Sequence, residues 1–230
     1  MARWGMVIDL NRCIGCEACT VACRAQNFTP GGVSWTRIIK EESGQFPDVT
    51  ALPFPLQCQQ CGNPPCVAVC PTGATYTRDD GIVAIDYNAC IGCRYCVIAC
   101  PYGARTYDEA KETWFPAGAT DFETFADQFG DEPDGSVALP ARHQSGVVEK
   151  CVFCVQKIEA GLAAGLTPGV DADATPACVV TCIGEARTFG DLDDPTSAVS
   201  ILASSPNAQS FHGEYGTKPH IYYLPVRTIE

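Results

Sequence analysis

The sequence is poor in basic residues, in histidine and in long apolar runs. It has 15 lysines and arginines against 27 acidic residues, and the formal charge of −12 repels phosphate backbones and disfavours nucleic-acid binding. Its apolar runs, such as VSILA at 199–203, are far shorter than the roughly 20 residues of a membrane-spanning helix. No G-x-G-x-x-G or Walker loop and no nucleophile–base pair is present, so we expect neither a nucleotide site nor substrate turnover by this chain alone.

The N-terminal sequence also lacks a targeting signal. The opening MARWGMVIDL shows no charged-then-apolar pattern and no twin-arginine pair, and the first cysteine follows at position 13. We therefore expect that the chain carries no removed leader and that it is synthesised in the cytoplasm.

Cysteine, by contrast, is abundant and regularly placed. All 16 cysteines fall into four groups of four, and none is left over. Groups one and three match C-x2-C-x2-C-x3-C, and each contains a glycine that allows the loop to curl around a ligand. In chain order the groups are Cys13, Cys16, Cys19 and Cys23; Cys58, Cys61, Cys66 and Cys70; Cys90, Cys93, Cys96 and Cys100; and Cys151, Cys154, Cys178 and Cys182.

Three chemistries use cysteine at this density. A disulfide framework is disfavoured by the expected cytoplasmic synthesis and by the closely spaced C-x2-C-x2-C runs. Zinc knuckles fit the paired cysteines of groups two and four, but not the runs of groups one and three. Those runs are typical of bacterial ferredoxins, in which three cysteines hold one 4Fe–4S cluster and the fourth binds the other cluster. The sequence therefore predicts 4Fe–4S clusters that exchange ligands between paired groups.

The rest of the sequence repeats with the cysteines and indicates how the groups pair. GMVIDLNRC resembles GIVAIDYNAC, each an apolar strand before a loop, and PPCVAVC of group two resembles PACVVTC of group four. Groups two and three are neighbours and would pair, which leaves group one for group four. The exchange of fourth ligands then predicts four sites. They are Cys13, Cys16, Cys19 and Cys182 (cluster 1); Cys23, Cys151, Cys154 and Cys178 (cluster 2); Cys58, Cys61, Cys66 and Cys100 (cluster 3); and Cys70, Cys90, Cys93 and Cys96 (cluster 4).

Few other side chains are candidates for a role at the clusters. Lys150 and Lys157 flank Cys151 and Cys154, and each is either a solvated side chain or a cation that raises a cluster potential by favouring the reduced state. The three histidines fit no Rieske or haem-attachment pattern and are interpreted as surface or packing residues. They are His143, His212 and His220.

The combined motifs resemble one family. They are MVIDLNRCIGCEACTVAC, QCGNPPCVAVCPTGA, ACIGCRYCVIACPYGAR, EKCVFC, PACVVTC and FGDLDDP, and they lie within residues 6–107 and 148–195. They are similar to the four-cluster iron–sulfur subunits of molybdopterin oxidoreductases of the DMSO reductase type, with the polysulfide, thiosulfate, arsenate and DMSO reductases nearest in layout. Arg24 and Ile183 stand where proline follows the last cysteine of the other two groups, and neither change removes a ligand.

The resemblance implies a non-catalytic subunit that relays single electrons. Its partners would be a large subunit with a molybdenum or tungsten bis-pyranopterin and a quinone-linked membrane subunit or soluble carrier. The Cys13 cluster would lie nearest the catalytic subunit, followed by the Cys151, Cys58 and Cys90 clusters. Nitrate-reductase-like relatives have tryptophan at the position of Cys93, so cysteine here implies a four-iron cluster. Export with a signal-bearing partner would make the protein periplasmic rather than cytoplasmic, and peripheral to the membrane where an anchor subunit exists.

Two other functions fit part of these observations. A polyferredoxin, free or within a hydrogenase or formate-oxidising complex, would use the same clusters, and a neighbouring gene for a pterin-binding protein would argue against it. A zinc-stapled interaction module would have no redox role, and a brown purified protein would exclude it.

The fold class predicted is α+β, with two interleaved ferredoxin-like modules, long loops and little regular structure, because metal–thiolate bonds replace part of a hydrophobic core. Module A comprises residues 1–50 and 148–195, and module B comprises residues 51–107. Residues 108–147 form an acidic insert, either a solvated excursion or a contact with the catalytic partner, and residues 196–230 form a tail that wraps the modules. We also expect a helix in QKIEAGLAAGL and a strand in HIYYLPV. The insert's aromatic residues are Trp114, Phe115, Phe122, Phe125 and Phe129.

Overall fold

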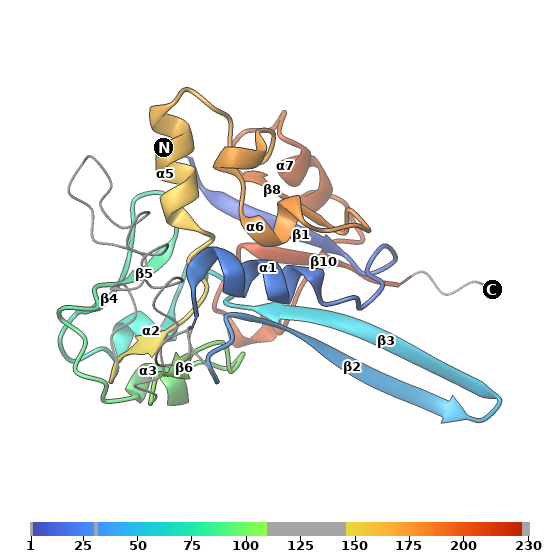
Figure 1. The fold of residues 1–230 in the computed structure, drawn as a ribbon, viewed down its shortest axis with the longest axis horizontal. Coiled ribbons are helices and arrows are strands. Elements are labelled where there is room, and N and C mark those ends of the chain that lie inside the picture. The colour runs from blue at the N-terminus through green and yellow to red at the C-terminus, as the bar shows by residue number, and fades with distance from the viewer. Residues whose placement is uncertain (1, 30–31, 110–145, 227–230) are drawn as a thin grey trace, which may run out of the picture.

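The computed structural model describes residues 2–29, 32–109 and 146–226, so the aromatic residues of the insert and His143 lie outside the described residues. Short helices and strands surround the cysteine loops, and one long hairpin extends from the body (Figure 1), in agreement with the α+β prediction. The strands are β1 (Trp4–Asp9), β2 (Thr36–Gln45), β3 (Asp48–Gln57), β4 (Thr75–Thr77), β5 (Val83–Ile85), β6 (Thr106–Tyr107), β7 (Val148–Glu149), β8 (Arg187–Asp191), β9 (Gln209–Ser210) and β10 (Ile221–Leu224). The α-helices are α1 (Ala18–Asn27), α2 (Pro65–Ala68), α3 (Tyr95–Ile98), α5 (Val155–Ala163), α6 (Ala177–Val180) and α7 (Ala198–Ala203), with 3-10 turns at Ala172–Ala174 and Gly213–Tyr215. In the described ranges no helix combines the length and the apolar character that a membrane crossing requires.

The largest sheet joins the two ends of the described chain. Its strand order is β8–β1–β10–β9, in which β1 runs parallel to β10 and antiparallel to β8. Met6 and Ile8 of β1 pack in the main core with Ile221 and Tyr223 of β10. The strands predicted in MVIDL and HIYYLPV and the helix predicted in QKIEAGLAAGL are therefore confirmed. β10 is an inner strand of the sheet, between β1 and β9.

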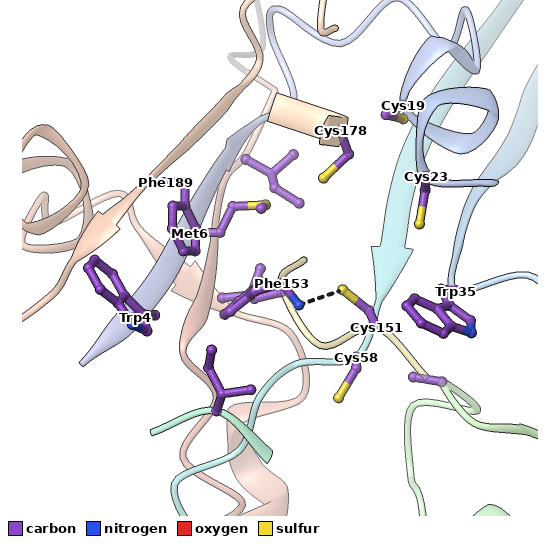
Figure 2. Close-up of a cluster of buried hydrophobic side chains, with 14 of the residues drawn as sticks. Trp4, Met6, Cys19, Cys23, Trp35, Cys58, Cys151, Phe153, Cys178 and Phe189 are labelled. Carbon is purple, nitrogen blue, oxygen red and sulfur yellow. Dashed lines mark hydrogen bonds between the residues drawn. The ribbon is translucent and has the colours of Figure 1, made fainter. Parts of the chain in front are cut away.

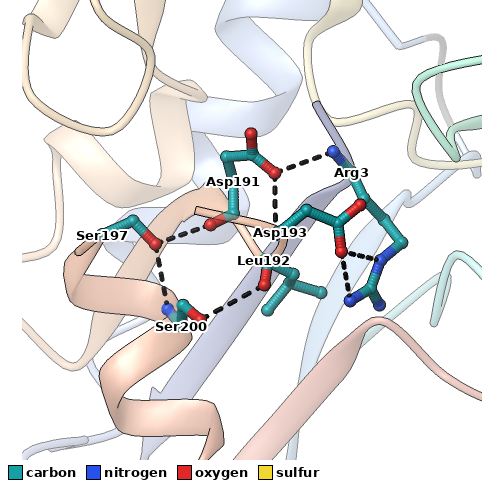
Figure 3. A network of polar contacts seen from close by, with 6 residues as sticks. All are labelled: Arg3, Asp191, Leu192, Asp193, Ser197 and Ser200. Carbon is teal, nitrogen blue, oxygen red and sulfur yellow. Dashed lines mark hydrogen bonds and ion pairs between the residues drawn. The ribbon is translucent and has the colours of Figure 1, made fainter. Parts of the chain in front are cut away.

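A polar network holds the residues before β1 against the turn that follows β8 (Figure 3). The backbone N–H of Arg3 donates to Asp191 Oδ1 at 2.8 Å, and the Arg3 guanidinium pairs with Asp193 at 2.7 Å. Ser197 caps α7: its Oγ accepts from the N–H of Ser200 at 3.1 Å and donates to the carbonyl of Asp191 at 2.6 Å. The FGDLDDP motif thereby fastens α7 and β8 to the start of the chain.

The hairpin of β2 and β3 was not predicted. Ten residue pairs join its strands, from Thr36–Gln57 at the base to Gln45–Asp48 at the tip. The outer half is exposed, and Phe46 at the tip is 93% exposed, whereas Phe54 near the base stacks on Tyr223 with ring centroids 4.6 Å apart. An isolated two-stranded ribbon is marginal in water, so the hairpin depends on this base. The boundary expected between residues 50 and 51 falls inside β3.

Two small two-stranded sheets lie beside the loops of the second and third cysteine groups. β4 pairs with β5, which is the buried apolar strand predicted before Cys90, and β6 pairs with β7. β7 was expected in module A but pairs with a strand of module B, so the modules share this contact. The tail also reaches module B, since the N–H of Gly62 donates to the carbonyl of Lys218 at 2.7 Å.

We expect the contact between β10 and β1 to stabilise the whole fold. Ile221 is fully buried beside Met6, so Ile221→Ala should lower the free energy of unfolding by about 2–5 kcal/mol through lost contacts and a residual cavity. Ile201→Ala on α7, where the side chain is 60% exposed, is the matched control and should change it by less than about 0.5 kcal/mol. Denaturant titration of both variants under argon measures the difference, and equal losses would show that β10 is not part of the core.

Candidate iron–sulfur centres

The first cysteine set lies at the surface, between the loop after β1 and the loop before β8. The N–H of Ala186 donates to Cys182 Sγ at 3.2 Å, and Cys16 is exposed whereas Cys19 is buried. Ile38 and Pro55 at the base of the long hairpin line the same cavity. The cysteines around this cavity are the four predicted for cluster 1: Cys13, Cys16, Cys19 and Cys182.

The second set lies in the hydrophobic core, and all four of its cysteines are buried: Cys23, Cys151, Cys154 and Cys178. Asn27 links two of them, because its Nδ2 lies 3.5 Å from Cys23 Sγ and 3.7 Å from Cys154 Sγ. Figure 2 shows the sulfurs of Cys23, Cys151 and Cys178 directed toward one shared space, while the sulfur of Cys58 points away from it. The core therefore brings together the residues predicted for cluster 2.

The remaining eight cysteines line two further cavities in module B. In one of them the N–H of Thr75 donates to Cys70 Sγ at 3.4 Å, and Cys93 is exposed. Each cavity combines three cysteines of one group with one of the other group. The two sets are Cys58, Cys61, Cys66 and Cys100, and Cys70, Cys90, Cys93 and Cys96.

The loops with matching cysteine spacing also have matching backbones. φ is +67° at both Gly15 and Gly92, and it is +62° at Glu17 and +64° at Arg94. Each loop thus makes the same left-handed turns before α1 or α3 begins. Glycine adopts this conformation freely, whereas an L-residue with a side chain is strained by about 1–2 kcal/mol. Strain of this kind persists where the surrounding structure holds a functional loop in place.

The cavities suit a cofactor that binds thiolates. Desolvation raises the pKa of Cys178 to about 11 and that of Cys61 to about 12, so a nearby positive charge is needed to favour their thiolate forms at neutral pH. Iron supplies such a charge when it binds. The backbone N–H of Phe153 lies 3.5 Å from Cys151 Sγ and favours its thiolate form. Four cysteines in each set match the four corners of a 4Fe–4S cubane.

The two lysines named from the sequence differ in their surroundings. Lys150 is buried, and its Nζ donates to the carbonyl of Cys151 at 2.9 Å. Desolvation lowers the pKa of Lys150, and the charge of Cys58 opposes this effect. Lys157 is partly exposed and donates to the carbonyl of Ala172 at 2.8 Å. An influence of either lysine on a cluster potential stays a prediction.

The two described histidines are packing and surface residues, as predicted. His220 is buried, and its backbone N–H donates to the carbonyl of Gln59 at 3.0 Å. His212 stacks on Tyr215, and its Nδ1 lies 2.8 Å from a carboxylate oxygen of Glu214.

Sequence reasoning missed two buried arginines. Arg105 and Arg187 are 4% and 5% exposed, although arginine is almost never buried without a partner. Arg105 Nη2 lies 3.1 Å from Cys66 Sγ, and Arg187 Nη2 lies 3.6 Å from Cys19 Sγ. A signal was present in the sequence, because both arginines occur in an Ala-Arg-Thr triplet shortly after the last cysteine of a group.

The tight turn at Gly92 should be necessary for its cysteine set. A Cβ at this position would lie 2.1 Å from the carbonyl oxygen of Gly146, so Gly92→Ala must displace the loop and should reduce the iron content. Gly165→Ala is the matched control, because Gly165 also has positive φ (+75°) but has open space around the added atom. It should cost about 1–2 kcal/mol of stability and keep the wild-type iron content. Iron analysis of both variants checks this, and full iron content in Gly92→Ala would contradict it.

Comparison with known proteins agrees with this geometry. Two family models, each described as a 4Fe-4S dicluster domain, match residues 12–74 and 49–118. The chain is 43% identical over 227 residues to the B subunit of the selenate reductase of Mesobacillus selenatarsenatis, with 96% of this chain and 72% of that protein covered. It is 38% identical to the iron-sulfur cluster-binding subunit of menaquinone reductase of Nitratidesulfovibrio vulgaris, with 98% and 89% covered.

A third relative is the arsenate respiratory reductase iron-sulfur subunit ArrB of Shewanella sp. strain ANA-3. The two sequences are 35% identical, with 96% of each chain covered. The identity and the coverage of these relatives confirm the resemblance seen in the motifs. The chain therefore belongs to the family of iron–sulfur electron-transfer subunits of the molybdopterin oxidoreductases.

Proposed function

We propose that the chain binds four 4Fe–4S clusters, one in each cysteine set, and relays single electrons through them. The observation that carries this proposal is the exchange of cysteines between loops: three cavities and one buried cluster of sulfurs each combine three cysteines of one group with one of another. A bound 4Fe–4S cluster supplies one-electron chemistry. The chain's own residues hold the clusters and set the distance between them.

The proposed path runs through clusters 1, 2, 3 and 4 in that order. The exposure of the cysteines supports the choice of clusters 1 and 4 as the two ends of the path. Cys16 of the first set and Cys93 of the last are exposed, whereas all cysteines of the second set are buried. Adjacency supports the order: α1 carries Cys19 of the first set and Cys23 of the second, one turn apart. The second and third sets meet where Gln60 Nε2 donates to the carbonyl of Cys151 at 2.7 Å.

We infer two partners for the two ends of this path. Exposed apolar side chains adjoin each exposed cysteine, Ile14 beside Cys16 and Ile91 beside Cys93, and such surfaces mark contacts with other proteins. The relatives named above are subunits of reductases, one of them a menaquinone reductase. By this likeness the first end contacts a catalytic subunit with a molybdenum or tungsten bis-pyranopterin, and the last contacts a quinone-linked membrane subunit or a soluble carrier.

The resemblance also supports a periplasmic location. We propose that clusters are inserted in the cytoplasm and that the folded chain is then exported with a signal-bearing catalytic partner. Fractionation of cells with and without that partner tests the route, and an equal periplasmic amount in both would contradict it.

Metal analysis of the native complex is the most direct test of the function. The complex is purified without oxygen, its chains are identified, and iron, zinc, molybdenum and tungsten are measured. We expect about 16 iron atoms per chain, four for each cluster, and molybdenum or tungsten in a large partner. The same iron without a partner would indicate a free polyferredoxin, and zinc in place of iron would overturn the proposal.

Paired cysteine variants test the ligand sets. Cys70→Ser and Cys93→Ser should alter the same cluster, because both cysteines line one cavity although they belong to different groups. Cys61→Ser, from the same group as Cys70, should alter a different cluster. Redox titration followed by EPR identifies the affected signal in each variant. A common signal for Cys61→Ser and Cys70→Ser, separate from that of Cys93→Ser, would rule out the exchange of ligands.

A further inference from the structure

Each module has a buried arginine at the same position relative to the last cysteine of a group. Arg187 is the fifth residue after Cys182, and Arg105 is the fifth residue after Cys100. Alanine precedes each arginine, and threonine and an aromatic residue follow it. Arg187 begins β8 and Arg105 directly precedes β6, so a short loop from the last cysteine into a strand positions both guanidinium groups.

Arg187 lies between the first and the second cysteine set. Its Nη2 is 3.6 Å from Cys19 Sγ, and its Nη1 is 4.0 Å from Cys178 Sγ. Nη1 also lies 3.5 Å from the sulfur of Met6, which belongs to the core. The guanidinium is therefore at almost the same distance from a cysteine of each set, on a side chain that is almost wholly buried.

Arg105 has the equivalent place between the third and the fourth set. Its Nη2 is 3.1 Å from Cys66 Sγ, it interacts with the thiol of Cys96, and its Nη1 is 3.2 Å from Thr75 Oγ1. Among the described residues, neither Arg105 nor Arg187 has a carboxylate within ion-pair distance. In that part of the chain cysteine sulfurs are therefore the anions that each arginine faces.

We infer that Arg187 raises the reduction potentials of clusters 1 and 2, and that Arg105 raises those of clusters 3 and 4. A fixed positive charge favours an added electron, and it acts strongly in a buried, weakly polarisable place. Arginine keeps its proton at every pH at which proteins fold, so this charge is permanent. Because each guanidinium faces cysteines of two sets, it raises the potentials of both neighbouring clusters. The inference rests on the proposed ligand sets.

The test is a redox titration, followed by EPR, of the intact complex. Arg187→Gln should lower the equilibrium constant for reduction of clusters 1 and 2 about tenfold, which lowers their reduction potentials by about 59 mV for a one-electron couple. The potentials of clusters 3 and 4 should stay unchanged. Arg105→Gln should have the converse effect. Arg187→Lys and Arg105→Lys keep the positive charge, so their cluster potentials should stay close to those of the wild type. Arg3→Leu, which removes an arginine paired with Asp193 at the surface, is the control and should move no potential.

Several outcomes would overturn the inference while the function stands. One is a glutamine variant with full iron content and unchanged reduction potentials. Another is an equal change of potential in all four clusters. A third is a lysine variant whose potentials fall as far as those of the glutamine variant. Arg187→Met and Arg105→Met provide a second neutral pair where glutamine costs iron, and loss of iron from glutamine, methionine and lysine variants alike would make the arginines purely structural. A wild-type complex without about 16 iron atoms per chain would instead contradict the proposed function.

Discussion

Each cysteine set takes its members from two different cysteine groups of the sequence, and the rest of the structure depends on this constraint. Cys182 lies in one cavity with Cys13, Cys16 and Cys19, although more than 160 residues separate it from them in the sequence. The pairing of β1 with β8 and β10 holds these ends together, and α1 packs against α6. Much of the sparse regular structure thus serves to align loops, and metal–thiolate bonds add the stability that a larger core would provide.

Burial of so many sulfurs creates an electrostatic requirement. A thiolate in the core needs a positive neighbour or a hydrogen-bond donor, and the protein is acidic overall. In the described part of the chain the buried lysine and arginine residues are Arg105, Lys150 and Arg187. Lys150 faces Cys151 and Cys58, so these three residues occupy the junctions between consecutive sets. The basic side chains that the interior holds are thus placed between the sulfurs.

The chemistry of the site was easier to predict than its framework. Cysteine spacing is set by the geometry of a cubane, so the groups, their repeats and the strands before Cys13 and Cys90 could be predicted from short motifs. The hairpin of β2 and β3 could not, because TRIIKEESGQ is mostly polar and is stabilised by contacts made at its base. Arg105 and Arg187 belong to no ligand motif, and their place beside the cysteines follows from the tertiary fold rather than from local sequence. The module boundaries were drawn from cysteine positions, while β3 and β7 follow backbone pairing across them.

The inner position of β10 has a consequence for biosynthesis. The strand at Ile221–Leu224 pairs directly with β1, which leaves the ribosome before the other described strands, so the central sheet is completed only when nearly all described residues have been translated. The cysteines from Cys58 to Cys100 are translated long before this point and include both sets of module B. The fourth member of the first set, Cys182, is thus translated after every cysteine of module B, and Cys13, Cys16 and Cys19 precede all of them. The first cysteine set is therefore the one whose members are separated by the longest stretch of synthesis before β10 completes the sheet.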